Sequence, residues 1–130
     1  MKALKKISSL LPPLNRQFHH VSNALLFDKV EILRDVEDIA RDLHNELKNE
    51  LDANAIFINQ EVYERIDYYA KKYKDSLNFV VPYLYVEKNF DGGDAWAFFT
   101  EKEKEIDQEY KNLLAFLRDE ALKKKEQVYG

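Results

Sequence analysis

The chain has no cysteine and only three glycines and three prolines among its 130 residues. Without cysteine it forms no disulfide and no thiolate zinc site, and it has no cysteine nucleophile; we expect a reducing, cytoplasmic location. Neither glycine nor proline occurs between Leu14 and Val81, where apolar residues recur every three or four positions. That spacing predicts long amphipathic helices.

Long apolar runs and an excess of positive charge are also missing. No stretch approaches the roughly twenty apolar residues that a transmembrane helix needs, so we expect no membrane span. Twenty basic residues face 24 acidic ones, which gives a net charge of −4. This acidic balance argues against direct nucleic-acid binding. The length and the 45% hydrophobic content suit a single domain over residues 1–130.

The predicted fold is all-α, an up-down bundle of three long helices preceded by a short N-terminal helix. Residues 1–13 form the short segment, which ends at Pro12 and Pro13, and residues 14–130 form the bundle. The first long helix has Asn15 as its N-cap and ends within residues 48–54. Its main apolar stripe consists of Phe18, Val21, Leu25, Ile32, Val36, Ile39, Leu43 and Leu47.

The second long helix has Asn59 as its N-cap and runs to Pro82, which kinks or ends it. A short aromatic segment follows, either helical or extended, up to the break at Asp91 and two glycines. Thr100 and Glu103 match a capping box and predict the start of the last long helix.

Four carboxylates spaced four, three and four residues apart share one face of the first long helix: Glu31, Asp35, Asp38 and Asp42. Like charges at these spacings repel, so a metal, a basic partner or a role as a nucleic-acid mimic would compensate them. The alternative is an ordinary solvated face, because Arg34 and Arg41 lie within one turn of these acids.

Seven aromatic residues fall between Phe79 and Phe99. Aromatic clusters near a loop are typical of protein-binding hot spots, whereas large side chains also fill the open end of a bundle. Both interpretations stay open. The residues predicted to contact a partner are Tyr83, Tyr85, Phe90, Trp96, Phe98 and Phe99.

Catalytic patterns are incomplete. A ferritin-like metal site needs Glu-x-x-His pairs, and Arg41 occupies the position three residues before His44. A magnesium-dependent nucleotide pyrophosphohydrolase of the MazG type would match Glu61 and Glu64, but Lys104 replaces a carboxylate in the second half of that motif, before Asp107. We therefore expect no enzyme, no cofactor and no metal, with such a hydrolase as an alternative.

Two stretches carry a resemblance. Residues 26–33 begin Leu-Phe-Asp-Lys, and residues 55–66 contain Phe-Ile-Asn-Gln-Glu-Val-Tyr. They are similar to uncharacterised bacterial helical-hairpin proteins, in which a Phe-Asp-Lys-Arg helix precedes a Phe-Ile-Ser-x-Glu-Val-Tyr helix start. The resemblance implies a helical hairpin and no activity. Many of those proteins carry an N-terminal membrane anchor, which we do not expect here.

The function predicted from these features is binding to another protein. By analogy, compact acidic bundles without catalytic residues include phage or mobile-element inhibitors of host systems. An acidic nucleic-acid mimic is a further alternative. The wide apolar stripe would seal a homodimer as well as an intramolecular bundle.

Overall fold

A computed structural model describes residues 2–26, 30–80 and 92–129. In these residues the chain is helical, with four α-helices and one short 3-10 helix. The elements are α1 (Lys2–Leu26), α2 (Val30–Ala53), η1 (Ala55–Phe57), α3 (Gln60–Val80) and α5 (Gly92–Tyr129). The all-α prediction is confirmed.

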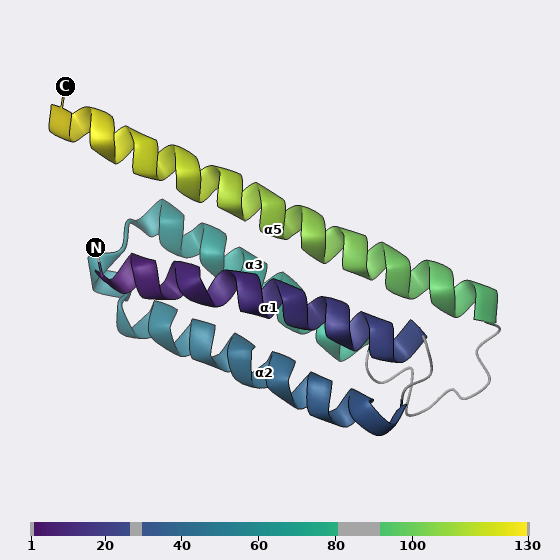
Figure 1. Cartoon of the computed structure of the whole chain (residues 1–130). Coiled ribbons are helices and arrows are strands. Elements are labelled where there is room, and N and C mark those ends of the chain that lie inside the picture. Colours follow the sequence, from purple (N-terminus) through teal and green to yellow (C-terminus); the bar gives the residue numbers. More distant parts are fainter. Residues whose placement is uncertain (1, 27–29, 81–91, 130) are drawn as a thin grey trace.

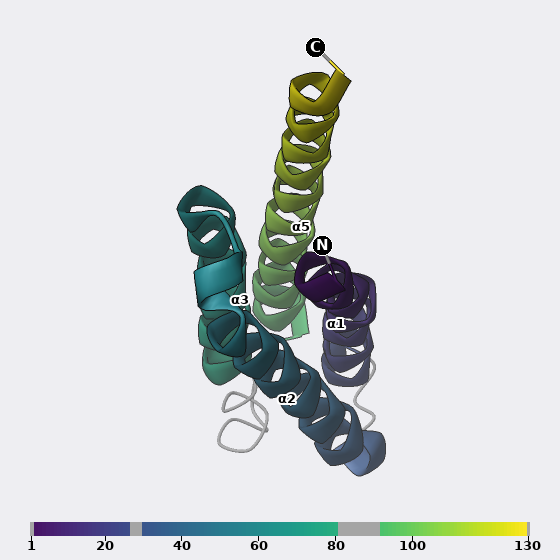
Figure 2. The same ribbon diagram turned by 90° about the vertical axis from the view of Figure 1, so that its left-hand side faces the viewer.

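The four α-helices lie lengthwise beside one another, and each runs opposite to the one before it (Figure 1). Seen from one end, they follow a cycle in which α1 contacts α2 and α5, and α3 contacts the same two helices (Figure 2). Helix α5 is the longest, and its C-terminal end diverges from the other three. No helix within the described ranges is both long and apolar enough to cross a bilayer.

The core is formed by all four helices. Its centre holds two tyrosines of α3, Tyr69 and Tyr73, which are 1% and 0% exposed. The ring of Phe18 meets that of Tyr73 edge-on at 5.4 Å, and Tyr110 lies 6.2 Å from Tyr69. Both buried hydroxyls find acceptors, because Tyr73 donates to the Leu14 carbonyl at 2.8 Å and Tyr69 donates to the Asn15 side chain at 3.2 Å.

The expected short N-terminal helix ending at Pro12 and Pro13 is wrong, since α1 continues through both prolines to Leu26. Each proline removes one backbone hydrogen bond and would normally end the helix. Burial across the prolines offsets this cost. The residues that line the inner face on both sides of them are fully or almost fully buried: Ile7, Leu11, Leu14, Phe18 and Val21.

The single long helix expected from Asn15 onward is also wrong, because α1 ends at Leu26 and α2 begins at Val30. Asn15 is therefore buried within α1 instead of capping it. The inner face of α2 is formed by Leu33, Ala40, Leu47 and Leu51, all 0% exposed. Ile32 and Ile39, predicted to lie in the apolar stripe, are instead 46% and 48% exposed.

The start of α3 is as predicted, whereas that of α5 is not. The Asn59 side chain accepts a hydrogen bond from the Glu61 amide at 2.9 Å, the bond expected of an N-cap. By contrast, Thr100 lies inside α5, so the predicted capping box is wrong. The carboxylate of Glu103 bonds to α1 instead. Pro82, expected to kink the chain, lies outside the described residues.

Candidate functional site

The predicted acidic stripe lies on the outward face of α2. Asp35, Asp38 and Asp42 are exposed, and none forms an ion pair with a cation of the described residues. Glu31 belongs to α2, but its side chain is not described. Arg41 pairs with Glu37 at 3.7 Å and donates to the Asn78 side chain at 2.9 Å. The expected neutralising lattice is therefore only partly formed.

The predicted aromatic contact residues fall into three groups. Tyr83, Tyr85 and Phe90 lie outside the described residues. Trp96 and Phe98 belong to α5, but their side chains are not described. Phe99 is 4% exposed and belongs to the core.

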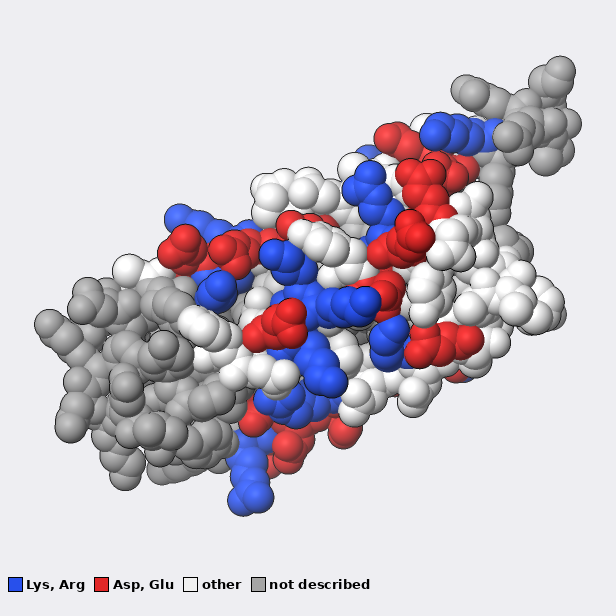
Figure 3. Space-filling view, turned by 180° about the vertical axis from the view of Figure 1, so that it is seen from behind, with Lys and Arg blue, Asp and Glu red and all other residues white. Residues whose placement is uncertain are grey.

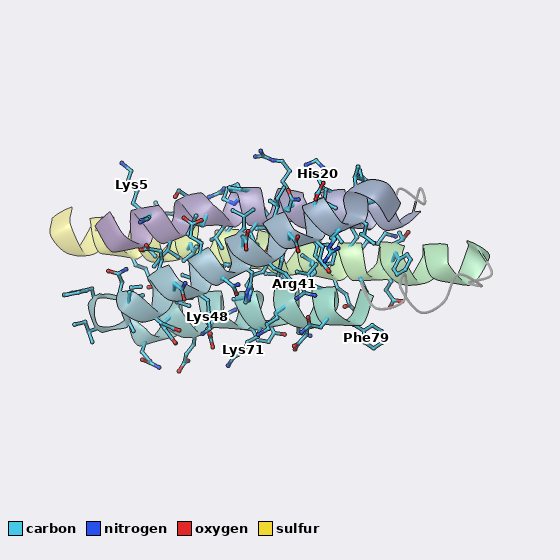
Figure 4. The ribbon with its side chains drawn as sticks, turned by 90° about the horizontal axis from the view of Figure 1, so that it is seen from below. Lys5, His20, Arg41, Lys48, Lys71 and Phe79 are labelled. Carbon is cyan, nitrogen blue, oxygen red and sulfur yellow. The ribbon has the colours of Figure 1, made fainter. Side chains whose placement is uncertain are left out.

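Phe79, at the end of α3, is 49% exposed. The ammonium group of Lys102 on α5 lies 5.2 Å from the centre of the Phe79 ring. This cation–π contact leaves much of the ring on the surface (Figure 4).

The acids considered for a hydrolase do not form a metal site. Glu61 and Glu64 are exposed on the first turns of α3, whereas Asp107 bonds to Asn15 and Lys111. Among the described residues, no group of three or more His, Asp or Glu side chains is arranged to hold a metal ion.

A surface that the sequence analysis did not identify lies at η1, between α2 and α3. Ile56 is 86% exposed and Phe57 is 62% exposed, and no residue of η1 is buried. We call these two side chains the η1 knob. They are the two most exposed large apolar side chains of the described residues, and adjacent exposed apolar side chains are a feature of protein interaction sites.

The backbone on both sides of the η1 knob is well fixed. The Asn54 side chain donates to the Glu50 carbonyl at 2.8 Å, and the Phe57 amide donates to the Asn54 carbonyl at 2.9 Å. After the knob, Ile58 returns to the core and Asn59 caps α3. A partner would therefore meet a surface that is already ordered, which lowers the entropy cost of binding.

A partly buried polar cluster joins α1 to α5. His19 contacts the Glu103 carboxylate, which also accepts a hydrogen bond from Ser22 at 2.8 Å. One turn further along α5, Asp107 accepts from Asn15 at 3.3 Å and pairs with Lys111 at 3.1 Å. The hydrogen bond from Lys111 and that from Asn15 lower the pKa of Asp107 below its usual value. We attribute a structural role to this cluster, because each member already has a partner inside the protein.

The chain matches no family model, and no curated protein or solved structure is similar to it. The candidate sites therefore depend on geometry alone. The η1 knob had one signal in the sequence, the apolar run Ala55–Ile58 between two polar stretches. This run is too short for its apolar spacing to distinguish a buried strand or turn from an exposed one.

Proposed function

We propose that this protein is an up-down helical bundle that acts by binding another protein, without catalysis. The observation that carries the proposal is the η1 knob, because Ile56 and Phe57 are exposed on a turn whose backbone is held by its own hydrogen bonds. Apolar side chains of this size supply most of the binding energy when they enter a partner's pocket.

The outward face of α2 supports the same function. Ile32 and Ile39 lie nearly half exposed among the unpaired carboxylates of Asp35, Asp38 and Asp42. A partner for this face would combine apolar contacts with basic side chains. A nucleic-acid mimic would use the carboxylates alone, so its binding would be steeply salt-dependent and would survive replacement of both isoleucines by serine.

The aromatic residues of the predicted contact region remain part of the proposal. Trp96 and Phe98 stand one turn or less before the buried Phe99 on α5. Aromatic side chains are frequent among the residues that dominate protein–protein binding, so we keep both residues as candidate partner contacts. An inhibitor of a host system is the narrower form of this proposal, and it would require the bound partner to lose activity.

The test is a quantitative pull-down from the source cell with the full chain, comparing it with the double variant Ile56→Ser/Phe57→Ser. The control is Leu122→Ser, which changes another exposed apolar residue (53%) on α5. We expect a stoichiometric partner with the unaltered chain and the control, and a loss of at least tenfold in its recovery with the double variant. Circular dichroism should show unchanged helicity and melting in all three.

Two results would refute the proposal. One is equal recovery of every captured protein by the double variant. The other is binding of the unaltered chain to phospholipid vesicles that is lost in the double variant, because this outcome would make the η1 knob a membrane contact. Sedimentation of the pure protein tests whether the partner is a second copy, which would show a dimer that the double variant dissociates.

A further inference from the structure

A groove between α2 and α3 lies away from the η1 knob, along the middle of both helices. Its volume is about 190 Å³, and it is lined by Arg41, His44, Asn45, Lys74 and Leu77. We call it the cationic groove. Figure 4 shows Arg41 and Lys48 of α2 near the junction with α3, and Lys71 at the outer edge of α3. Figure 3 shows Lys and Arg side chains over the middle of the face, with Asp and Glu side chains among them.

The charges beside the groove are not fully balanced. Arg41 pairs with Glu37, while Lys48 and Lys71 both contact Asp67. Burial alone would raise the pKa of Asp67, but the hydrogen bonds from Lys48 and Lys71 lower it, so its carboxylate stays ionised. Lys74 lines the groove and has no carboxylate partner in the part of the chain that the structure describes. Among the described residues, Lys74 therefore gives the groove one positive charge that forms no ion pair.

Three groups offer hydrogen-bond capacity toward the groove. The Arg41 guanidinium has five N–H donors and uses one of them on Asn78, with a second directed at Glu37. Asn45 is exposed, and its side-chain amide touches the His44 Nδ1 atom only at 3.4 Å. The ammonium group of Lys74 carries three donors.

His44 forms the floor of the groove. It is 7% exposed, and its Nε2 atom donates to the Ala70 carbonyl at 3.0 Å. Its ring stacks on Tyr73 at 6.3 Å between centres. Burial lowers the pKa of His44; the hydrogen bonds with Asn45 and the Ala70 carbonyl partly oppose this, and the positive charges of Lys74 and Lys48 add to it. An anion in the groove would oppose the effect of these two positive charges on the pKa of His44.

We infer that the cationic groove binds a single tetrahedral oxyanion, a sulfate or a phosphate group, held by Arg41, Lys74 and Asn45. The volume of about 190 Å³ accommodates one such group, either as a free ion or as the phosphate of a modified side chain. Charge-assisted hydrogen bonds from arginine and lysine are the usual means of recognising these groups.

The test is an NMR titration of the full protein with sodium sulfate, observing the His44 ring, against sodium chloride at equal ionic strength. The main variant is Lys74→Gln, which breaks no ion pair, and the control is Lys72→Gln, since Lys72 lies over the Tyr68 ring instead. We expect saturable shifts at His44 with sulfate, affinity about tenfold weaker in the Lys74 variant, and no change in the control. The pKa of His44 should rise when sulfate binds.

A parallel titration with O-phosphoserine distinguishes the two sources of the group, because stronger binding than sulfate would indicate a phosphorylated side chain. The inference is wrong if the shifts with sulfate and chloride coincide, or if Lys74→Gln and Lys72→Gln weaken binding equally. Either result would show that sulfate acts only by screening the surface charges.

Discussion

Replacing both Pro12 and Pro13 by alanine should stabilise the protein, although such prolines often mark a helix boundary. In the structure both prolines lie inside α1, between the buried residues Leu11 and Leu14. Alanine would restore the backbone donors of residues 12 and 13 and remove the steric conflict of each ring with the preceding turn. The sign of the change therefore tests where the first helix begins.

The expected size follows from helix energetics. One proline in a helix interior costs about 3 kcal/mol relative to alanine. The two costs are not additive here, because the neighbouring rings disturb the same turn. Pro12 is exposed and contributes little packing, whereas Pro13 is partly buried and its loss removes about 1 kcal/mol of apolar burial. We expect a net gain of about 2 kcal/mol in the free energy of unfolding, or about 6 °C in Tm.

The assay is urea unfolding followed by far-ultraviolet circular dichroism, with thermal melting as a second readout. A useful control is Leu11→Ala, which should lose about 2–5 kcal/mol if the residues before the prolines pack in the core. If the helix began after Pro13 instead, the two alanines would increase the conformational entropy of the unfolded chain. They would then destabilise the protein by about 0.4–1 kcal/mol per proline. A loss of stability in the double variant would refute the continuous helix α1.

Three further predictions concern single side chains. Burial lowers the pKa of His44, so below about pH 6.5 the unfolded chain binds a proton that the folded chain does not, and the free energy of unfolding should decrease as the pH is lowered; urea titrations at several pH values should show a smaller decrease in His44→Gln. The lowered pKa of Asp107 contributes stability above about pH 4 that is lost as pH falls further, and Asp107→Asn should remove this part of the acid sensitivity. Trp96→Ala and Phe98→Ala should each weaken partner recovery without changing helicity or melting, whereas Phe99→Ala should lower the free energy of unfolding by about 3–5 kcal/mol; a comparable loss in the first two variants would assign them to the core.

Periodicity and capping predicted α3 well, because both signals agree there. Asn59 bonds to the first turn, and Val62, Ile66 and Leu77, which recur at helical spacing in the sequence, are buried. The prediction succeeded because one helix, with a clear start, presents one face to one core.

The boundary between α1 and α2 could not be read in the same way. Val36, Leu43 and Leu47 continue the three- and four-residue spacing of Phe18 and Val21, so two helices look like one. The spacing of apolar residues shows which face of a helix is apolar. It does not show a turn at which the chain reverses direction if the same spacing continues across that turn. The exposed Ile32 and Ile39 are the consequence: they were predicted in the main apolar stripe but lie outside the inner face of α2.

The polar cluster between α1 and α5 could not be predicted from the sequence either, and the packing of α5 shows why. Its buried apolar residues, Phe99, Ile106 and Leu113, are seven residues apart. A slip of two turns, about 10 Å, would therefore place apolar residues in the same positions. Hydrophobic burial alone therefore fixes which face of α5 packs inward but not how far along α1 it sits. The same slip would replace Glu103 by Trp96 or Tyr110.

After such a slip, His19 and Ser22 would lose the carboxylate that both contact, and Asn15 would lose Asp107. Leaving the buried side chains of Ser22 and Asn15 without these partners costs about 1–3 kcal/mol each. We infer that these contacts select one register of α5. In the sequence, Glu103 and Asp107 are two of many acids on a charged helix, and only the partners that α1 brings to them give them this role.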